Sequence, residues 1–180
     1  MSKAGKQPKA ERLAAFDSIV SRYEAALLRY AARIVGDPDA AQDIIQNTFI
    51  RLFRKWEERL EPSPQVSSWL YRVAHNCAVD HMRRESRRRL LHLRHAEGAR
   101  DFVPPNRGAA FRISEEARRA AEALRKLSQR ERQLVVLKVY EEKTYREISE
   151  ITGLTVSNVG YILHHAMKKM AAELRRIQAI

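Results

Sequence analysis

The feature that most constrains the fold of this 180-residue chain is the spacing of its apolar residues. They recur at intervals of three and four almost from end to end, and only 6 Gly and 6 Pro interrupt them. Such intervals place successive apolar side chains on one face of an α-helix, whereas a strand would need them at every second position. No alternating pattern competes. The sequence therefore predicts an all-α protein.

The N-terminal third contains two amphipathic stretches, each long enough for a helix. The first runs from near Leu13 to Gly36, a residue type that commonly ends a helix because it adopts the left-handed conformation without strain. Asp37 and Pro38 follow at once, and this pair is typical of an N-cap and a first helical residue. We therefore expect a second helix from there to about Leu60.

A third helix is expected after a loop with two prolines at residues 61–65. It begins near Ser67, and its apolar residues share one face. The opposite face is a polar ridge, because its residues follow one another at intervals of three and four. The ridge consists of Arg72, Asn76, Asp80, Arg83 and Arg87.

The best domain boundary lies where the periodicity fades, between Ser86 and Ile113. This stretch is basic and contains two adjacent prolines, which is typical of a linker. The sequence therefore predicts two small helical domains, residues 1–87 and 114–180. They are joined by a basic linker at residues 88–113, whose first part is compatible with a helix.

Sharper signals mark the C-terminal domain. Ser-Gln-Arg-Glu at residues 128–131 and Thr-Tyr-Arg-Glu at residues 144–147 match the capping box, in which a hydroxyl and a carboxylate each bind an unpaired backbone N–H. Each therefore marks the start of a helix. Gly153 is a predicted helix end, and Thr155 is the predicted cap of a last helix. Together these signals predict a helix-turn-helix at residues 144–169.

The charge balance favours a polyanionic partner. The chain has 34 Lys and Arg against 22 Asp and Glu, a formal charge of +12, so nucleic acid is the first candidate and an anionic membrane surface the second. The one acidic block, residues 36–66, directly precedes the most basic one, residues 67–113. No apolar run approaches the roughly 18 residues that cross a membrane, and the N-terminus lacks the pattern of a signal peptide. We expect a cytoplasmic protein with no membrane insertion.

Motifs of catalysis and metal binding are absent from the sequence. There is no Gly-rich phosphate loop and no His-Glu-x-x-His pair, and a single cysteine, Cys77, provides neither a zinc set nor an intramolecular disulfide. Cys77 is expected to be a small core residue. We therefore predict no metal, no cofactor and no enzymatic activity. The histidines are interpreted as surface or DNA-facing groups: His75, His81, His92, His95, His164 and His165.

Three segments, taken in order, resemble one known family. They are Asp-Ile-Ile-Gln-Asn-Thr-Phe-Ile-Arg-Leu-Phe at residues 43–53, Trp-Leu-Tyr-Arg-Val-Ala-His-Asn-Cys-Ala-Val-Asp-His-Met-Arg-Arg at residues 69–84, and Leu-Ser-Gln-Arg-Glu-Arg at residues 127–132 followed by Tyr-Arg-Glu-Ile-Ser-Glu-Ile-Thr-Gly at residues 145–153. Over nearly its whole length the chain resembles the extracytoplasmic-function sigma factors of the sigma-70 family. The helix-turn-helix alone would be less specific, because many repressors and activators contain one.

The resemblance implies a factor that binds core RNA polymerase and directs promoter recognition, promoter melting and initiation, with an anti-sigma factor as a potential further partner. Residues 1–87 correspond to region 2 and residues 114–180 to region 4. The core polymerase-binding residues it implies are Asp43, Gln46, Asn47, Phe49, Arg51 and Phe53. Those for minus-ten DNA are Arg72, Asn76, Asp80, Arg83, Arg84 and Arg87. Those for minus-thirty-five DNA are Thr155, Ser157, Asn158, Tyr161, His165, Lys168 and Lys169.

The residue types of the third helix fit single-stranded DNA, whose bases are held by pockets and stacking while cations follow the backbone. Asp80 is the exception, since DNA would repel a carboxylate. Arg83 or Arg84, one helical turn further on, can pair with it, so we interpret Asp80 as a positioning residue.

Two departures from the family pattern are visible. Asn47 stands where the family usually has Glu. In the last helix, Asn-Val-Gly-Tyr-Ile-Leu-His-His-Ala at residues 158–166 stands where many members have Thr-Val-Lys-Ser-Arg-Leu-His-Arg-Ala, so that Ile162 and His165 replace arginines. We therefore expect fewer phosphate contacts and a promoter sequence that differs from the common one.

Two other functions fit parts of the sequence. A helix-turn-helix regulator could dimerise through residues 13–85 and bind an operator unaided, but the chain has no sensor domain, and a dimerisation unit would not require the tryptophan and arginines of the third helix. A basic adaptor could bind RNA or a membrane surface, and its activity would then depend on charge and ignore sequence.

Overall fold

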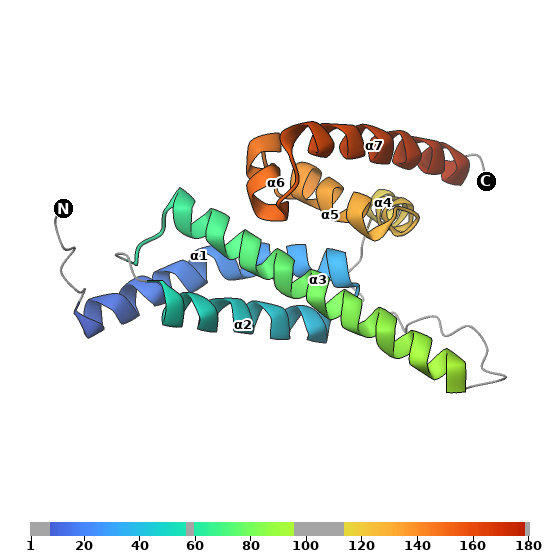
Figure 1. The fold of residues 1–180 in the computed structure, drawn as a ribbon. Helices are drawn as coiled ribbons and strands as arrows, with labels where there is room; N and C mark the ends of the chain where they lie inside the picture. Colours follow the sequence, from blue (N-terminus) through green and yellow to red (C-terminus); the bar gives the residue numbers. More distant parts are fainter. Residues whose placement is uncertain (1–7, 57–59, 96–113, 179–180) are drawn as a thin grey trace. The chain divides into compact units, whose positions relative to one another are not determined.

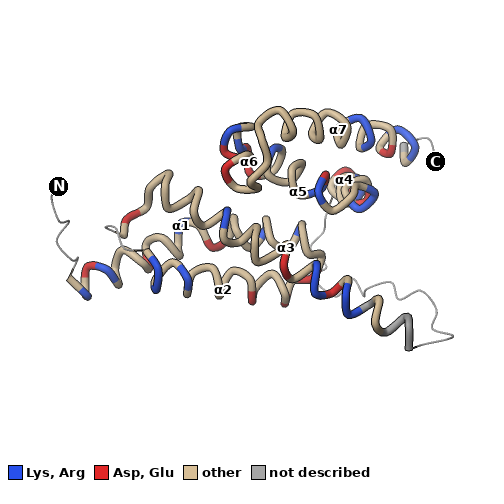
Figure 2. Tube along the Cα trace, in the orientation of Figure 1, with Lys and Arg blue, Asp and Glu red and all other residues tan. Residues whose placement is uncertain are grey.

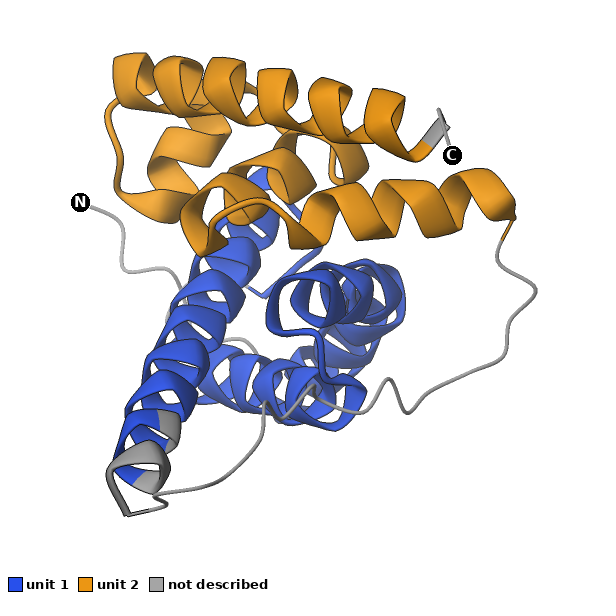
Figure 3. Cartoon of the chain, turned by 90° about the vertical axis from the view of Figure 1, so that its right-hand side faces the viewer, with its two compact units in different colours: residues 1–103 blue, residues 104–180 orange. Residues whose placement is uncertain are grey.

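The computed structural model describes residues 8–56, 60–95 and 114–178, and in these ranges every regular element is a helix. The all-α prediction is confirmed. The chain divides into two compact units, residues 1–103 and 104–180, which Figure 3 distinguishes by colour. Unit 1 and unit 2 each have a hydrophobic core.

Unit 1 is a bundle of three helices, α1 (Lys9–Val35), α2 (Pro38–Lys55) and α3 (Pro64–His95), each of which packs on the other two (Figure 1). Its fully buried side chains include Ile19, Leu27, Tyr30, Leu52 and Leu70. Because the three apolar stripes meet along one seam, burial of these side chains holds the bundle together. The C-terminal part of α3 extends beyond α1 and α2 (Figure 1).

The predicted junction between α1 and α2 is confirmed. Gly36 ends α1 with a φ of 74°, and its N–H donates to the carbonyl of Ala32 at 2.9 Å. The side chain of Asp37 then caps α2 by accepting from the backbone N–H of Asp39 at 3.0 Å. Pro38 is the first residue of α2, as predicted.

Helix α2 ends earlier than predicted, at Lys55 instead of about Leu60. Trp56 is extended, with a ψ of 111°, and its indole packs edge-on against the indole of Trp69 at 6.0 Å between ring centroids. Arg12 of α1 donates from Nη2 to the carbonyls of Phe53 at 2.8 Å and Trp56 at 2.9 Å. A packed tryptophan and an arginine from another helix thus fix the end of α2, and neither is visible as a local stop signal.

Helix α3 begins at Pro64 and not near Ser67, because Ser63 caps it. The Ser63 hydroxyl accepts from the N–H of Val66 at 3.3 Å, and its carbonyl accepts from the N–H of Ser67 at 2.9 Å. At its other end α3 continues to His95, into the range 88–113 that was predicted as the linker. Residues 96–113 of that range lie outside the described residues.

The interpretation of His75 as a surface group is wrong. His75 is only 5% exposed, and its Nδ1 is hydrogen-bonded to the hydroxyl of Tyr30 at 2.9 Å. Burial lowers the pKa of His75 to about 4, so the imidazole is a neutral core group at pH 7. His164 and His165 are exposed and His81 is half-buried, whereas the side chains of His92 and His95 lie outside the described residues.

Unit 2 contains α4 (Glu115–Arg125), α5 (Gln129–Val135), the π-helical turn η1 (Val136–Tyr140), α6 (Tyr145–Thr152) and α7 (Val156–Gln178). Helix α7 packs on α4, α5 and α6. The helix-turn-helix is formed by α6 and α7, and Gly153 ends α6 with a φ of 73°, as predicted. The π-helical turn after α5 was not predicted.

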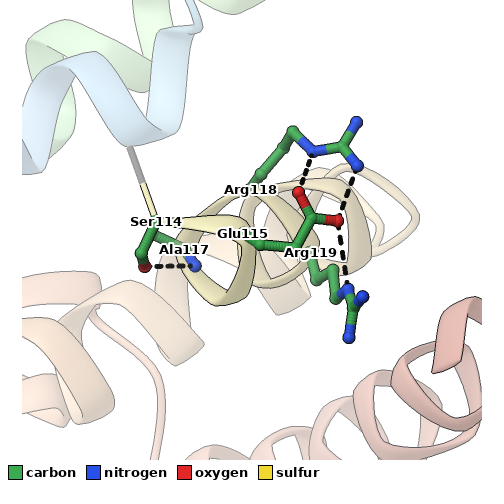
Figure 4. A network of polar contacts seen from close by, with 5 residues as sticks. All are labelled: Ser114, Glu115, Ala117, Arg118 and Arg119. Carbon is green, nitrogen blue, oxygen red and sulfur yellow. Dashed lines mark hydrogen bonds and ion pairs between the residues drawn. The ribbon is translucent and has the colours of Figure 1, made fainter. Parts of the chain in front are cut away.

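Helix α4 begins at Glu115, directly after its N-cap Ser114. Figure 4 shows the Ser114 hydroxyl accepting from the N–H of Ala117, at 3.2 Å, beside a small ionic network on the first turn. Glu115 accepts from Arg118 at 2.6 and 3.0 Å and from Arg119 at 3.3 Å. The bond from Arg118, followed by its charge, lowers the pKa of Glu115. Because the network is exposed, it adds little to stability.

Both predicted capping boxes are present, at Ser128 with Glu131 and at Thr144 with Glu147. In the first, Lys169 of α7 also donates from Nζ to Glu131 at 2.6 Å. Burial alone would raise the pKa of Glu131, but the bonds from Lys169 and Ser128 outweigh it and the pKa is lowered. This carboxylate therefore caps α5 and at the same time ties it to α7.

Replacing Thr144 with alanine is expected to destabilise unit 2 by about 1 kcal/mol, because it removes one side of the second capping box. The Thr144 hydroxyl accepts from the N–H of Glu147 at 3.2 Å and donates to its carboxylate at 2.7 Å. Urea denaturation followed by circular dichroism measures the loss. Thr144→Ser keeps the hydroxyl and should stay near wild type, so equal losses in both variants would contradict the capping role.

Candidate functional site

The predicted polymerase-binding residues of α2 divide into two groups. Asp43, Gln46, Asn47 and Arg51 are exposed, and the side-chain amide of Asn47 donates to the carbonyl of Asp43 at 2.9 Å. Phe49, in contrast, is 6% exposed and packs on Phe16 with a centroid distance of 6.2 Å. Phe49 is therefore a core residue that offers a partner little surface.

Phe53 lies at the edge of the same core. It is 36% exposed, its ring meets that of Phe16 at 5.1 Å, and the guanidinium of Arg12 lies 5.5 Å from its centroid. Since Arg12 also binds the last carbonyls of α2, this arginine fixes the end of the helix on which the predicted surface lies.

Sequence reasoning missed Ile50, which is 46% exposed on α2. It lies two helical turns after Asp43 and one turn after Gln46 and Asn47, so these four residues form one exposed stripe, which we call the α2 stripe. Beside Gln46 is a hollow of about 170 Å³ between α1 and α2, with Leu28 and Ile45 in its lining. An apolar side chain within an otherwise polar outer stripe was the signal that could have identified Ile50.

The predicted polar ridge of α3 is exposed to solvent along its whole length. Arg72, Asn76, Asp80, Arg83, Arg84 and Arg87 are all exposed. Figure 2 shows the cations gathered along the C-terminal part of α3. The expected pairing of Asp80 is present: Arg83 Nη1 lies 3.9 Å from its carboxylate, and Arg84 Nε donates to its carbonyl at 3.3 Å. At this distance and exposure the ion pair orients the side chains more than it stabilises the helix.

Cys77 is half-buried on α3, and burial raises the pKa of its thiol. A thiol with a raised pKa is a poor nucleophile at neutral pH. Among the described residues, no group of three or more His, Cys, Asp or Glu could hold a metal ion.

The exposed face of α7 contains most of the residues predicted for minus-thirty-five DNA. The Thr155 hydroxyl caps the helix by accepting from the N–H of Asn158 at 3.3 Å. The rings of Tyr161 and His165 contact each other, with centroids 4.4 Å apart and planes tilted by 58°. All seven members of the set are exposed: Thr155, Ser157, Asn158, Tyr161, His165, Lys168 and Lys169. Lys169 differs from the others, because its ion pair with Glu131 gives it a structural role.

His164 was missed as a neighbour of this face. It is exposed, and its ring lies 5.6 Å from that of His165. Tyr161, His164 and His165 therefore form one exposed ring cluster on α7. The sequence could have indicated this cluster, because His164 and His165 follow Tyr161 by three and four residues and so lie on the same side of a helix.

Of the helices in the described ranges, none is at once long and apolar enough to cross a membrane. The exposed faces of α3 and α7 carry groups suited to nucleic acid.

Comparison with known families finds two matches, in the order that the sequence predicts. Residues 19–88 match Sigma-70 region 2, and residues 117–170 match Sigma-70, region 4. Together the two matches cover more than half of the chain.

Alignments with known sigma factors extend over most of the chain. It is 27% identical over 171 residues to the ECF RNA polymerase sigma factor SigW of Bacillus subtilis, with 89% of each chain covered. It is 28% identical over 161 residues to the RNA polymerase sigma-E factor of Streptomyces coelicolor, with 88% of this chain and 85% of that protein covered.

Solved structures share the fold. The sigma factor RpoE in complex with the anti-sigma factor NepR from Bartonella quintana matches with a TM-score of 0.69 and 19% identity, over 89% of this chain and 96% of that one. CnrH in complex with the cytosolic domain of CnrY matches with a TM-score of 0.63 and 22% identity, over 93% and 99%.

Proposed function

This chain belongs to the sigma-70 family of RNA polymerase sigma factors, in its extracytoplasmic-function branch, and on that premise we propose how its surfaces divide the work of initiation. As a sigma factor it binds core RNA polymerase and directs promoter recognition. The observation that carries this function is the presence of both sigma-70 regions, in order, in one chain. We assign region 2 to residues 1–87, the linker to residues 88–113 and region 4 to residues 114–180.

The α2 stripe docks on core polymerase. Its exposed Asp43, Gln46 and Asn47 supply polar contacts, and Ile50 supplies the apolar one that a well-packed interface centre needs. The hollow beside Gln46 can receive a protruding side chain of the polymerase. Phe49, which was expected to contact the polymerase directly, instead supports the α2 stripe by packing in the core beneath it.

The ridge of α3 captures the melted minus-ten region. Arg72, Arg83 and Arg87 follow the backbone of the displaced strand, and Asn76 offers hydrogen bonds to an unpaired base. Asp80 orients Arg83 for this contact. Promoter melting then follows from the capture of one strand, because a captured strand cannot re-form the duplex.

Helix α7 enters the major groove at the minus-thirty-five element, while catalysis of RNA synthesis belongs to the polymerase and not to this chain. The site of action is the cytoplasm, where the polymerase and the chromosome are. An anti-sigma factor would inhibit the protein by covering the α2 stripe or the face of α7. One of the similar solved structures contains a sigma factor, RpoE, bound to the anti-sigma factor NepR, which supports this last assignment by analogy alone.

The double variant Asp43→Arg/Ile50→Glu is expected to bind core polymerase at least ten-fold more weakly, a loss of about 1.4 kcal/mol. Both residues are exposed, so the fold should survive. Core binding is measured by titration of labelled protein, and initiation by run-off transcription on a genomic promoter library. Tryptophan fluorescence checks the folding of unit 1, because Trp56 and Trp69 both lie in it and are the only two in the chain.

The pair Asn158→Ala/Tyr161→Ala on α7 is the reciprocal control. It should bind core polymerase as the wild type does but lose its promoter preference. If no polymerase-dependent transcript appears and the protein alone binds a defined DNA sequence, the sigma assignment fails and an operator-binding regulator is favoured. Binding that follows charge and ignores sequence would instead favour a basic adaptor.

A further inference from the structure

The exposed face of α7 lacks cations where a recognition helix reads bases. Helix α7 begins at Val156, and its first Lys or Arg is Lys168, more than three turns later. Figure 2 shows this part of the helix without Lys or Arg. In helix-turn-helix proteins the N-terminal residues of the second helix contact base edges. The first turns of the helix therefore present neither Lys nor Arg for base contact.

The neighbouring cations do not fill this gap. Lys169 is held by Glu131 at 2.6 Å. Arg146 is exposed on α6, the first helix of the motif, which crosses the DNA backbone and so is placed for phosphates. Guanine is most often recognised by an Arg or Lys that donates two hydrogen bonds to O6 and N7. No described residue at the start of α7 can make that contact.

The neutral groups that are present match an A·T pair. Asn158 is exposed in the first turn, and an asparagine amide can both donate to N7 and accept from the N6 amino group of adenine. Tyr161 is 67% exposed, and its ring provides the apolar contact that the methyl group of thymine seeks. The ring of His165 lies against that of Tyr161, with a centroid distance of 4.4 Å and a tilt of 58° between the planes.

The spacing of the two residues suits adjacent base pairs. Asn158 and Tyr161 are three residues apart, which is about 4.5 Å along a helix axis, against a rise of about 3.4 Å between base pairs. A helix lying in the major groove can therefore present the amide to one base pair and the ring to its neighbour.

We propose that α7 reads an upstream promoter element by A·T pairs, with Asn158 as the adenine reader and Tyr161 as the thymine reader, and that it makes no two-bond Arg or Lys contact to guanine. The inference rests on the proposed function, since it concerns the promoter contact of the same helix. It specifies what that function leaves open, namely which bases this particular sequence can recognise.

The test uses holoenzyme assembled from core polymerase and the full-length chain. A promoter obtained from the genomic library is randomised in its upstream element, and transcribed sequences are selected. Adenine and thymine should be enriched at two adjacent positions. Replacing the selected adenine by guanine should lower transcription about 5–150-fold, the usual penalty for losing one two-bond base contact.

Variants assign the readers. Asn158→Ala should remove the adenine preference at one position, and Asn158→Arg should change it to guanine. Tyr161→Phe keeps the ring and should keep the thymine preference, whereas Tyr161→Ala should lose it. Each variant is first titrated with core polymerase, and unchanged core binding shows that the effect lies in promoter contact.

Enrichment of guanine by the wild type at the positions that respond to Asn158 and Tyr161 would overturn the inference while leaving the sigma function intact. The same holds if Asn158→Ala and Tyr161→Ala leave the selected sequence unchanged. If the wild type neither binds core polymerase nor initiates from any promoter, the proposed function itself fails, and this inference fails with it.

Discussion

Replacing Arg132 with alanine is expected to lower the unfolding free energy of unit 2 by about 2–3 kcal/mol, the range for losing charge-assisted hydrogen bonds to groups that stay partly buried. Arg132 donates from Nε to the carbonyl of Leu124 at 3.2 Å and from Nη2 to those of Arg125 at 3.1 Å and Leu127 at 3.4 Å. One guanidinium thus closes the end of α4, where helix carbonyls lack partners.

The energetic balance at Arg132 favours a large effect. The side chain is half-buried, and burial, followed by the charge of Arg125, lowers the pKa of its guanidinium. The guanidinium nevertheless stays charged, as arginine does in proteins. Its three hydrogen bonds to carbonyls offset the free-energy cost of burying that charge. Alanine would remove all three contacts, although the Leu124 carbonyl would still accept from the N–H of Leu127 at 3.3 Å. The tight connection between α4 and α5, and with it the support under α7, would loosen.

Circular dichroism during urea denaturation measures the effect, while tryptophan fluorescence reports unit 1 separately and should not change. Arg132→Lys keeps the charge but not the fork geometry and should recover only part of the loss. Arg130→Ala, two residues earlier on α5 and exposed, is the matched control and should stay within about 0.5 kcal/mol of wild type. An Arg132→Ala variant as stable as the Arg130 control would show that the three bonds do not hold α4.

Arg132 also shows where sequence reasoning stops. Its acceptors are backbone carbonyls five to eight residues away, and no side-chain pattern reveals them. The capping residues Asp37, Ser128 and Thr144 were predictable, because a cap binds within three residues of itself and leaves a local signature. Helix starts are therefore set by neighbours in sequence, whereas the end of α2 is set by Arg12, more than forty residues away.

The candidate surfaces follow the same division. Helical periodicity correctly placed Asp43, Arg72 and Asn158 on exposed faces, because side-chain direction along a helix is fixed by its geometry. It did not separate the buried Phe49 from the exposed Ile50, since adjacent residues lie at the boundary of the apolar stripe and tertiary packing decides which one it covers. Composition likewise gave no sign that His75 is buried, because histidine is as common at surfaces as in cores.

Lowering the pH from 6.5 to about 4 is expected to lower the unfolding free energy of unit 1 by about 3 kcal/mol through His75 alone. Burial lowers the pKa of His75 from 6.5 to about 4. Between these values the unfolded chain binds a proton that the folded chain excludes, so acid favours unfolding, and each pH step of one is worth about 1.4 kcal/mol. Above pH 6.5 both states are neutral, and below about pH 4 both are charged, so the contribution is constant outside this window.

Two variants isolate this contribution, with tryptophan fluorescence reporting unit 1 during urea denaturation at a series of pH values. His75→Gln cannot titrate, so its stability should fall less than that of the wild type between pH 6.5 and 4, whatever its stability at pH 7. Tyr30→Phe removes the hydroxyl bonded to Nδ1 but leaves the imidazole buried, and because burial causes the shift, this variant should keep the wild-type slope. If wild type and His75→Gln lose stability in parallel, carboxylates elsewhere in unit 1 account for the acid sensitivity, and His75 does not.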